Sequence, residues 1–492
     1  MIASSIQGYR EFVRAQSLLN PCLQSLVDYL SPNPAAPRDR QPSVHSISVS
    51  RNGSLTTNLD LEGLKDLISR KRRVGCEEPL GIILVIEDIC PATVELLGAG
   101  LSIDPLFFCD HINTSFPKSG SDPLPPSLVS FPSVIRNRDF VNIHSQRILD
   151  LGPIAKDATA SYDVSVFGNY KRNARRLVPL KGRQVALMRS CCSILLKKFP
   201  EHPWLCVILI DPTPDGYNTR PNLLVSPGSP YLAQEQSSLA RFEDFRDVLP
   251  FSSNLLPRHH QGSAISRRCF RETLLGYFES LPPSLDPQSP TALGLSYYPL
   301  RIIAAEWMQY THLMSRYVKH YEFSLKDDLH LRLHREDIVD LQRWRRRSDQ
   351  TLHKLMLTEQ FIAHRCGAEP DQALWSDVLD DYRFLTSCIG RYRNSLELIL
   401  PLATSMAQIA DTRRSMLEAS NVKHLTLIAL VFVPLAYVAS VFSMSDGYVP
   451  GGPKFWVYLS VAVPLMLVIV GLSFVSRARV IRLVVWLKGI LE

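Results

Sequence analysis

Few residues able to carry acid–base or metal chemistry lie close together in this sequence. Glu87 and Asp88 are adjacent carboxylates at the end of an apolar run, but neighbouring residues on a strand point to opposite faces. His111 and the pair His259-His260 have no partners at metal-ligand spacing. We therefore expect a strand end that meets solvent and loop or surface histidines, with no metal site built from protein ligands alone and no bound cofactor.

The composition disfavours several classes of function. The chain has no phosphate-binding glycine loop and no nucleophile elbow, so an enzyme is the weaker class. Lys plus Arg at 54 against Asp plus Glu at 47 gives a net charge of +7, too mild to indicate nucleic-acid binding. The basic clusters Lys71-Arg72-Arg73 and Arg343 with Arg345 to Arg347 are interpreted as solvated faces. The 10 cysteines lack metal spacing, which is typical of free thiols in a reducing cytosol.

Two apolar runs near the C-terminus dominate the sequence. Neither Leu425 to Phe442 nor Phe455 to Val475 contains a charged residue. Crossing a bilayer takes roughly 20 apolar residues as helix, so both runs qualify, the first marginally. We predict two transmembrane helices. The alternative is a pair of buried core helices.

The basic residues around these runs predict their orientation. Lys423 and His424 precede the first run, three arginines follow the second, and the loop between them offers Lys454 alone as a basic residue. By the positive-inside rule, both termini face the cytosol. The membrane, plasma membrane or another, is left open.

The chain before the runs divides into three parts, and a basic cytosolic tail, 477–492, follows the transmembrane hairpin, 425–476. Residues 1–60 are expected to be weakly structured beyond a short helix, and 61–290 to form an α/β cytosolic domain, followed by long stalk helices over 291–424. Within the α/β domain we predict strands at Gly81–Ile89 and Trp204–Pro212 and helices at Pro91–Leu101 and Gly182–Phe199.

The stalk contains three predicted helices. Two cover Tyr298–Phe323 and Glu336–Cys366, and the third opens after Pro370. Along the third helix, apolar residues recur in alternating steps of four and three, a heptad seam typical of a coiled coil; its members include Leu374, Val378, Tyr382, Leu385, Ile389, Tyr392, Leu396, Ile399, Ala403, Met406 and Ala410. The seam predicts self-association. The alternative is a helical bundle within one chain. No breaker separates this helix from the first apolar run, so one continuous helix is expected.

The C-terminal region resembles a known family, the CorA-type divalent cation transporters, and in particular their fungal CorA-like branch. The resemblance is carried by the segments Lys423–Ile428, Phe432–Leu435 and Ala439–Ser445, together with the order of the parts. It implies a homopentamer in a lipid bilayer, whose first spans line a pore for Mg²⁺ or a related ion such as Zn²⁺ or Co²⁺.

The resemblance also assigns roles to residues. The family's Gly-Met-Asn signature at the outer mouth of the pore falls on Ser443, Met444 and Ser445, so two of its three residues differ. Asp446 follows as the acidic residue of the outer loop, and the candidates for pore lining are Asn421, Thr426 and Pro434. Two functions stay open: a divalent cation channel or transporter, and a non-conducting CorA-like membrane protein with a sensing, assembly or interaction role.

Overall fold

A computed structural model describes the chain in segments that form two compact units, Met1–Leu400 and Pro401–Glu492. The described residues are 2–31, 41–50, 53–69, 79–112, 131, 133–134, 137–153, 163–166, 168–170, 172–178, 183–199, 202–213, 217–220, 223–224, 269–326, 335–368, 372–443 and 455–474.

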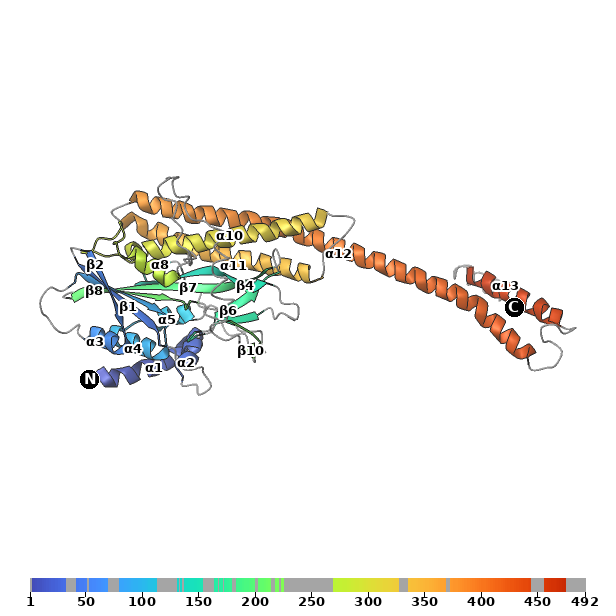
Figure 1. Ribbon diagram of the computed structural model, residues 1–492, viewed down its shortest axis with the longest axis horizontal. Helices are drawn as coiled ribbons and strands as arrows, with labels where there is room; N and C mark the ends of the chain where they lie inside the picture. Colours follow the sequence, from blue (N-terminus) through green and yellow to red (C-terminus); the bar gives the residue numbers. More distant parts are fainter. Residues whose placement is uncertain are drawn as a thin grey trace, which may run out of the picture. The chain divides into compact units, whose positions relative to one another are not determined.

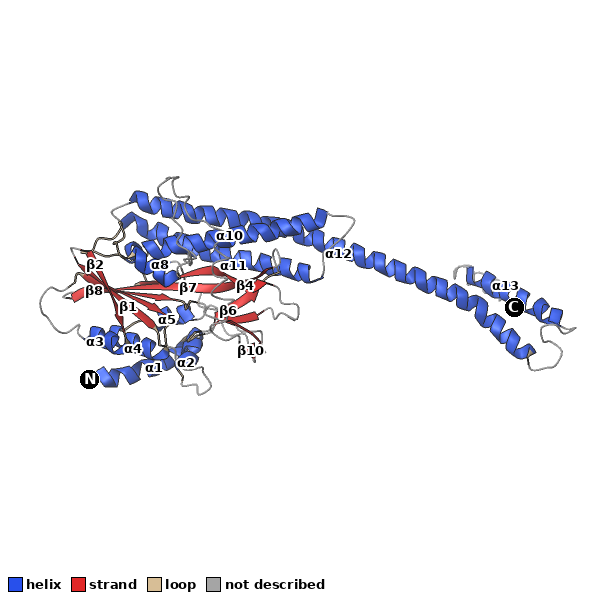
Figure 2. Cartoon of the chain, in the orientation of Figure 1, coloured by secondary structure: helices blue, strands red, loops and turns tan. Residues whose placement is uncertain are grey.

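A mixed sheet forms the middle layer of the first unit (Figure 2). Its strands are β1 (Ser43–Ser50), β2 (Gly53–Leu59), β3 (Gly81–Glu87), β4 (Phe140–Pro153), β5 (Asp163–Val166), β6 (Arg172–Arg176), β7 (Arg183–Phe199), β8 (His202–Ile210), β9 (Tyr217–Arg220) and β10 (Leu223–Leu224). Their order is β10-β9-β5-β6-β7-β8-β3-β1-β2, with β4 also paired to β7. Strands β3 and β8 are parallel, and the other pairs are antiparallel.

The N-terminal helices cover one face of this sheet (Figure 1). They are α1 (Ile2–Leu19), the 3₁₀ turn η1 (Pro21–Leu23), α2 (Gln24–Leu30), α3 (Leu61–Ser69), α4 (Pro91–Leu101) and α5 (Pro105–Ile112). Buried side chains of these helices and of β1, β3 and β8 form one apolar core. The Tyr9 hydroxyl, buried in this core, donates a hydrogen bond to the Ile103 carbonyl at 3.0 Å.

Longer helices cover the other face of the sheet (Figure 1). They are α10 (Tyr297–Lys326), α11 (Arg335–Arg365), which ends in the 3₁₀ turn η3 (Cys366–Ala368), and the first part of α12 (Gln372–Phe442); the short helices α8 (Phe270–Tyr277) and α9 (Ala292–Leu295) precede them. Large aromatic rings fill the space between α10 and α11. The Tyr317 and Trp344 ring centroids are 5.0 Å apart, and both side chains are buried.

The second unit contains the rest of α12 and α13 (Phe455–Phe474). The expected continuity of the third stalk helix with the first apolar run is confirmed, because α12 is one helix from Gln372 to Phe442.

Several predicted elements are confirmed. Strand β3, helix α4 and strand β8 match their predicted positions, and so do the long helices α10 and α11.

Two expectations about the helices and strands were wrong. Residues 1–60 are not weakly structured in their described part, because Val13 and Leu26 are fully buried in the core and β1 lies inside the sheet. The predicted helix at Gly182–Phe199 is strand β7. Its apolar residues fit the period of a helix and that of a strand equally well. The strand is formed because β7 pairs with β4 on one edge and with β6 and β8 on the other.

Candidate functional site

The apolar end of α12 exposes its side chains within this chain. An 18-residue window of α12 is long and apolar enough to cross a membrane, and only 6% of it is buried. Large side chains such as Phe432 and Tyr437 are exposed, and water disfavours such a surface. Among the described residues α12 is the one helix that meets this test, whereas the apolar stretch of α13 that can be assessed, Phe455–Ile469, is shorter. The second span therefore stays a prediction.

The predicted pore mouth is described only at its first residue. Ser443 follows α12 in a turn, and its backbone N–H donates to the Ala439 carbonyl at 2.9 Å. Met444, Ser445 and Asp446 lie outside the described residues.

The three pore-lining candidates do not share one helix face. With 3.6 residues per turn, Asn421 lies about 140° around α12 from both Thr426 and Pro434, which are themselves about 80° apart. Thr426 and Pro434 can therefore face the same axis, whereas Asn421 lies on the opposite side of the helix. The Thr426 hydroxyl donates to the Val422 carbonyl at 2.7 Å, so its oxygen lone pairs remain available as acceptors.

The heptad seam is largely buried inside the chain. The buried seam residues include Val378, Tyr382, Leu385, Ile389, Leu396, Ile399 and Ala403, whereas Leu374 and Met406 are partly exposed. The Tyr382 hydroxyl donates to the Leu300 carbonyl of α10 at 3.0 Å, and Arg393 pairs with Asp349 of α11 at 2.6 Å. The alternative of a bundle within one chain accounts for this part of the seam.

Further along α12, other apolar residues are exposed. Leu402, Ile409 and Met416 recur every seven residues, and Ile409 and Met416 are 53% and 67% exposed. Residues seven apart lie on nearly the same face of a helix. This stripe, unlike the buried seam, is exposed in the single chain.

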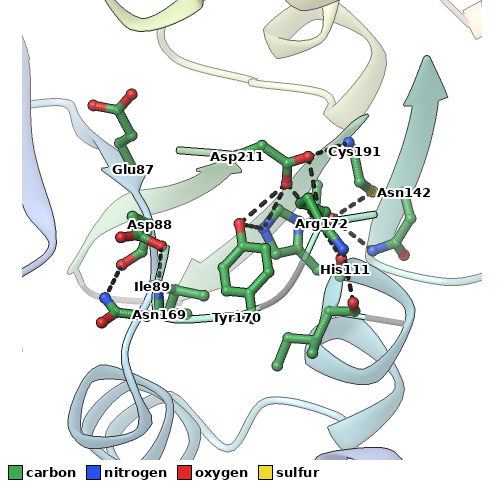
Figure 3. A network of polar contacts seen from close by, with 12 residues as sticks. Glu87, Asp88, Ile89, His111, Asn142, Asn169, Tyr170, Arg172, Cys191 and Asp211 are labelled. Atoms are coloured by element: carbon green, nitrogen blue, oxygen red, sulfur yellow. Dashed lines mark hydrogen bonds and ion pairs between the residues drawn. The ribbon is translucent and has the colours of Figure 1, made fainter. Parts of the chain in front are cut away.

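A buried polar network lies between the sheet and α5 (Figure 3). Its centre is Asp211, directly after β8. The Arg172 guanidinium binds this carboxylate through Nε at 3.0 Å and Nη2 at 2.7 Å. The Tyr170 hydroxyl donates to Asp211 Oδ1 at 3.1 Å, and the Cys191 N–H donates to Oδ2 at 3.1 Å. Four donor atoms therefore satisfy one buried carboxylate.

The sheet topology explains the position of Asp211. Strands β8 and β6 pair with the same edge of β7, through Cys192 and Met188 respectively. Among the described residues, no strand pairs with the β7 backbone between these two positions on that edge. Because Asp211 follows β8 at this gap, its carboxylate accepts the Cys191 N–H in place of a strand carbonyl.

A chain of hydrogen bonds extends from this carboxylate to β4. Asn142 Nδ2 donates to Ser193 Oγ at 2.7 Å, and Ser193 Oγ lies 2.8 Å from His111 Nδ1. His111 Nε2 lies 3.1 Å from the Tyr170 hydroxyl, which donates to Asp211. These directions fit a neutral imidazole protonated on Nε2, with Nδ1 accepting from Ser193. Each group then has a partner.

The hydrogen bond between Ser193 and His111 resembles that of a nucleophile and its base. The burial of both residues is instead typical of a structural network. Burial lowers the pKa of His111 to about 3 and raises the pKa of the Cys191 thiol to about 12. Burial alone would raise the pKa of Asp211, but the Arg172 charge outweighs it and holds that pKa below its usual value. His111 and the Ser193 side chain are fully buried, so Ser193 has no route to a substrate in this state.

The other polar residues singled out in the sequence do not form a common site in the described part of the chain. His111 is not a surface histidine, because α5 packs it against the sheet. Glu87 binds Arg271 at 2.6 Å and Thr213, whereas Asp88 Oδ1 accepts the Asn169 N–H at 2.8 Å. The two carboxylates therefore do not act as a pair. The expectation of a strand end that meets solvent was wrong, because both residues are buried. His259 and His260 lie outside the described residues.

Few residues of this network could be predicted from the sequence. The Asp-Pro that closes β8 was a visible signal for Asp211, but nothing in the sequence around Arg172 pointed to its partner. In the described part of the chain, no group of three or more His, Cys, Asp or Glu could hold a metal ion, and the cysteines there are free thiols.

Residues 284–477 match the family model described as CorA-like Mg²⁺ transporter protein. The C-terminal part of this chain thus resembles CorA. The matched segment contains α10 to α13 and is less than half of the chain. No curated protein matches the chain.

Two solved structures are similar at low identity. The CorA magnesium transporter from Methanocaldococcus jannaschii has a TM-score of 0.34 and 11% identity over 87% of this chain and 96% of that chain. The full-length CmaX protein has a TM-score of 0.36 and 13% identity, again over 87% and 96%. Scores this low do not establish a shared fold.

Proposed function

We propose that this chain is a CorA-like divalent cation channel or transporter of the fungal CorA-like branch, with no enzymatic activity. It moves Mg²⁺, or a related ion such as Zn²⁺ or Co²⁺, through a pore formed by several copies, five by family resemblance. The match of residues 284–477 to the CorA-like Mg²⁺ transporter model carries the proposal. The matched segment includes the apolar end of α12, whose exposed surface suits a bilayer.

One face of α12 offers oxygen acceptors along the apolar run. Thr426, Leu430 and Pro434 follow each other at steps of four, so they form one stripe along the helix. Pro434 has no N–H, so the Leu430 carbonyl lacks its usual helical donor. Because Mg²⁺ loses its water reluctantly, acceptors for its bound water suit its passage. We place this stripe at the pore axis, and Asn421 away from it.

The outer mouth departs from the family signature. Ser443 adds a side chain where the signature has glycine, and Ser445 offers a hydroxyl in place of the longer asparagine amide. A ring of Asp446 side chains would gather cations at the mouth, an effect that salt screens. We therefore propose a conducting pore of altered selectivity.

The changed signature also favours a second candidate. Loss of glycine and asparagine at the mouth fits a CorA-like membrane protein that does not conduct and whose cytosolic unit serves sensing, assembly or interaction. The two candidates differ in one measurable property, the flux of divalent ions.

Purified full-length protein in sealed liposomes containing an ion-sensitive dye tests the proposal. We expect uptake of at least one of Mg²⁺, Zn²⁺ and Co²⁺ above that of protein-free liposomes, increased by an inside-negative potential. Absence of uptake for all three ions, with protein inserted and oligomeric, would favour the non-conducting candidate.

A further inference from the structure

Strand β2 lies at the end of the sheet and is open on its outer edge. Among the described strands, it pairs only with β1. Four consecutive residues of β2 are exposed, namely Leu55, Thr56, Thr57 and Asn58. An exposed edge strand presents backbone groups that another strand can pair with.

The contacts of β1 show which residues of β2 point outward. The Leu80 N–H donates to the Val49 carbonyl at 2.8 Å, so Val49 directs this carbonyl toward β3. The backbone groups of successive strand residues alternate in direction, so Ser48 directs its own toward β2, where Leu55 lies opposite. Leu55 therefore pairs with β1, and its two neighbours point away from the sheet.

Three residues of β2 thus direct their N–H groups and carbonyls outward: Ser54, Thr56 and Asn58. Among the described residues, no backbone hydrogen bond joins these groups to another strand or loop. The edge offers three donors and three acceptors in the alternating pattern that an added β-strand satisfies.

Helix α8 and strand β1 hold this edge in place. The Ser54 hydroxyl lies 2.8 Å from the Phe278 carbonyl and 3.1 Å from the Glu279 carbonyl, at the end of α8. The Thr57 hydroxyl donates to the Ser46 carbonyl of β1 at 3.4 Å. An edge that is ordered before it binds loses less conformational entropy on pairing.

The composition of β2 fits a second copy of the same strand. β2 contains no charged residue and no proline, the residue types with which edge strands prevent pairing. In an antiparallel pair centred on Thr56, Ser54 lies opposite Asn58 and Leu55 lies opposite Thr57. No like charges meet, and the two central threonines are β-branched, which favours strands. A foreign strand would have to be selected by complementary charge, and β2 offers none.

We propose that β2 pairs antiparallel with β2 of a second copy, about a two-fold axis at Thr56, and so joins two sheets into one. A two-fold contact uses the same surface on both copies and joins them in pairs. It cannot close a ring with an odd number of copies, so it links neighbouring assemblies. The contact lies in the first unit and depends neither on ion conduction nor on the number of copies in a pore.

Cysteine cross-linking of the full chain in detergent tests the pairing. Opposite residues of a hydrogen-bonded antiparallel pair have Cα atoms about 5.5 Å apart, within reach of a disulfide. We expect Thr56→Cys to form a linked dimer under mild oxidation by copper phenanthroline. Asn58→Cys, exposed on the same edge but about 14 Å from its counterpart, is the matched control and should not be linked. Wild type, oxidised in parallel, controls for the native cysteines.

Sedimentation velocity of the full chain in detergent measures the contact without a covalent bond. We expect assemblies of doubled mass whose fraction rises with concentration. Thr56→Pro should weaken the doubling about tenfold or more, because two symmetry-related N–H donors are lost. The Thr56 N–H points away from β1, so proline leaves the sheet paired and should keep the unfolding midpoint of wild type. Thr56→Ala keeps the N–H and should retain the doubling.

Three results would overturn the proposal. One is the absence of a linked dimer from Thr56→Cys although a maleimide labels that cysteine, which would leave the edge to a foreign strand. Another is equal linking of Thr56→Cys and Asn58→Cys, which would indicate random collision. The third is doubling that persists unchanged in Thr56→Pro, which would locate the contact elsewhere.

Discussion

Asp211 is a buried carboxylate that joins three strands in the central part of the sheet. It binds Arg172 and Tyr170 and accepts the Cys191 N–H on the β7 edge, between the positions that pair with β6 and β8. An arginine left without its partner in the interior keeps its charge, because the guanidinium does not deprotonate. The stability of the first unit should therefore respond strongly to this single carboxylate.

Asp211→Asn is expected to destabilise the first unit by about 3 kcal/mol, since breaking one side of a buried ion pair leaves the other charge uncompensated. Urea unfolding of the full chain in detergent, followed by tryptophan fluorescence, measures the change. The matched control is Asp381→Asn, which removes a half-exposed partner of Arg301 and should cost less than about 1 kcal/mol. Equal effects of the two variants would contradict the assigned role of Asp211.

The buried histidines make stability depend on pH. Burial lowers the pKa of His111 to about 3, whereas the ring in an unfolded chain titrates at about 6.5. Between these values the unfolded state binds the proton and the folded state does not, so stability falls as pH drops below about 6.5. His144, whose pKa is lowered too, contributes in the same direction.

His111→Gln should therefore flatten the loss of stability between pH 7 and pH 5 without abolishing it, because His144 remains. Thermal midpoints at pH 7, 6 and 5 measure the slope. The exposed His353→Gln serves as control and should keep the slope of wild type. A slope in His111→Gln as steep as that of wild type would show that His111 is not the buried group responsible.

At the scale of elements, α12 has a buried apolar seam and an exposed apolar stripe. Leu385 and Ile389 are covered by the chain's own helices, so a charge at either position should unfold the first unit rather than only separate subunits. The stripe at Leu402, Ile409 and Met416 is exposed in the single chain and can pack against other copies.

Replacing Ile409 and Met416 together by Glu should reduce the oligomer in detergent without lowering the unfolding midpoint of the first unit. Native mass spectrometry counts the subunits, with a pentamer expected for wild type. Asp411→Asn, on the opposite face of α12, is the control and should keep the count. Retention of the full oligomer in the double variant would move the interface away from this stripe.

Local pattern predicted the elements that depend on local sequence. Strands β3 and β8 could be predicted from their apolar runs, and helices α10 and α11 from their helical periodicity, because each pattern lies within its own segment. Strand β7 was misread, since its apolar residues fit a helix equally well and only pairing with distant β4, β6 and β8 selects the strand. The Asp211 network was hidden for the same reason: His111, Arg172 and Asp211 meet only in the folded sheet.

For the whole molecule, the first prediction concerns topology. Basic residues flank both outer ends of the apolar hairpin, so tags before residue 1 and after Glu492 should both lie in the cytosol. A cysteine placed at Gly451 should react with an impermeant reagent applied outside sealed cells, in a background from which the native cysteines are removed. Protection of that cysteine, with labelling of the two tags, would mean the opposite orientation.

The two candidate functions predict different effects of substitutions at the proposed outer mouth of the pore. Replacing Ser443 by Gly frees the backbone from a Cβ, and replacing Ser445 by Asn provides a longer amide acceptor for water bound to the ion. The double change should therefore raise Mg²⁺ flux if several copies form a pore. The same change should have no effect on transport if the protein does not conduct.

Mg²⁺ uptake into liposomes, compared between wild type and the Ser443→Gly/Ser445→Asn variant at equal protein content, is the most direct test of the proposed pore. We expect measurable uptake with wild type and several-fold faster uptake with the double variant. Absence of Mg²⁺, Zn²⁺ and Co²⁺ uptake in both proteins, while both are oligomeric and correctly inserted, would contradict the channel.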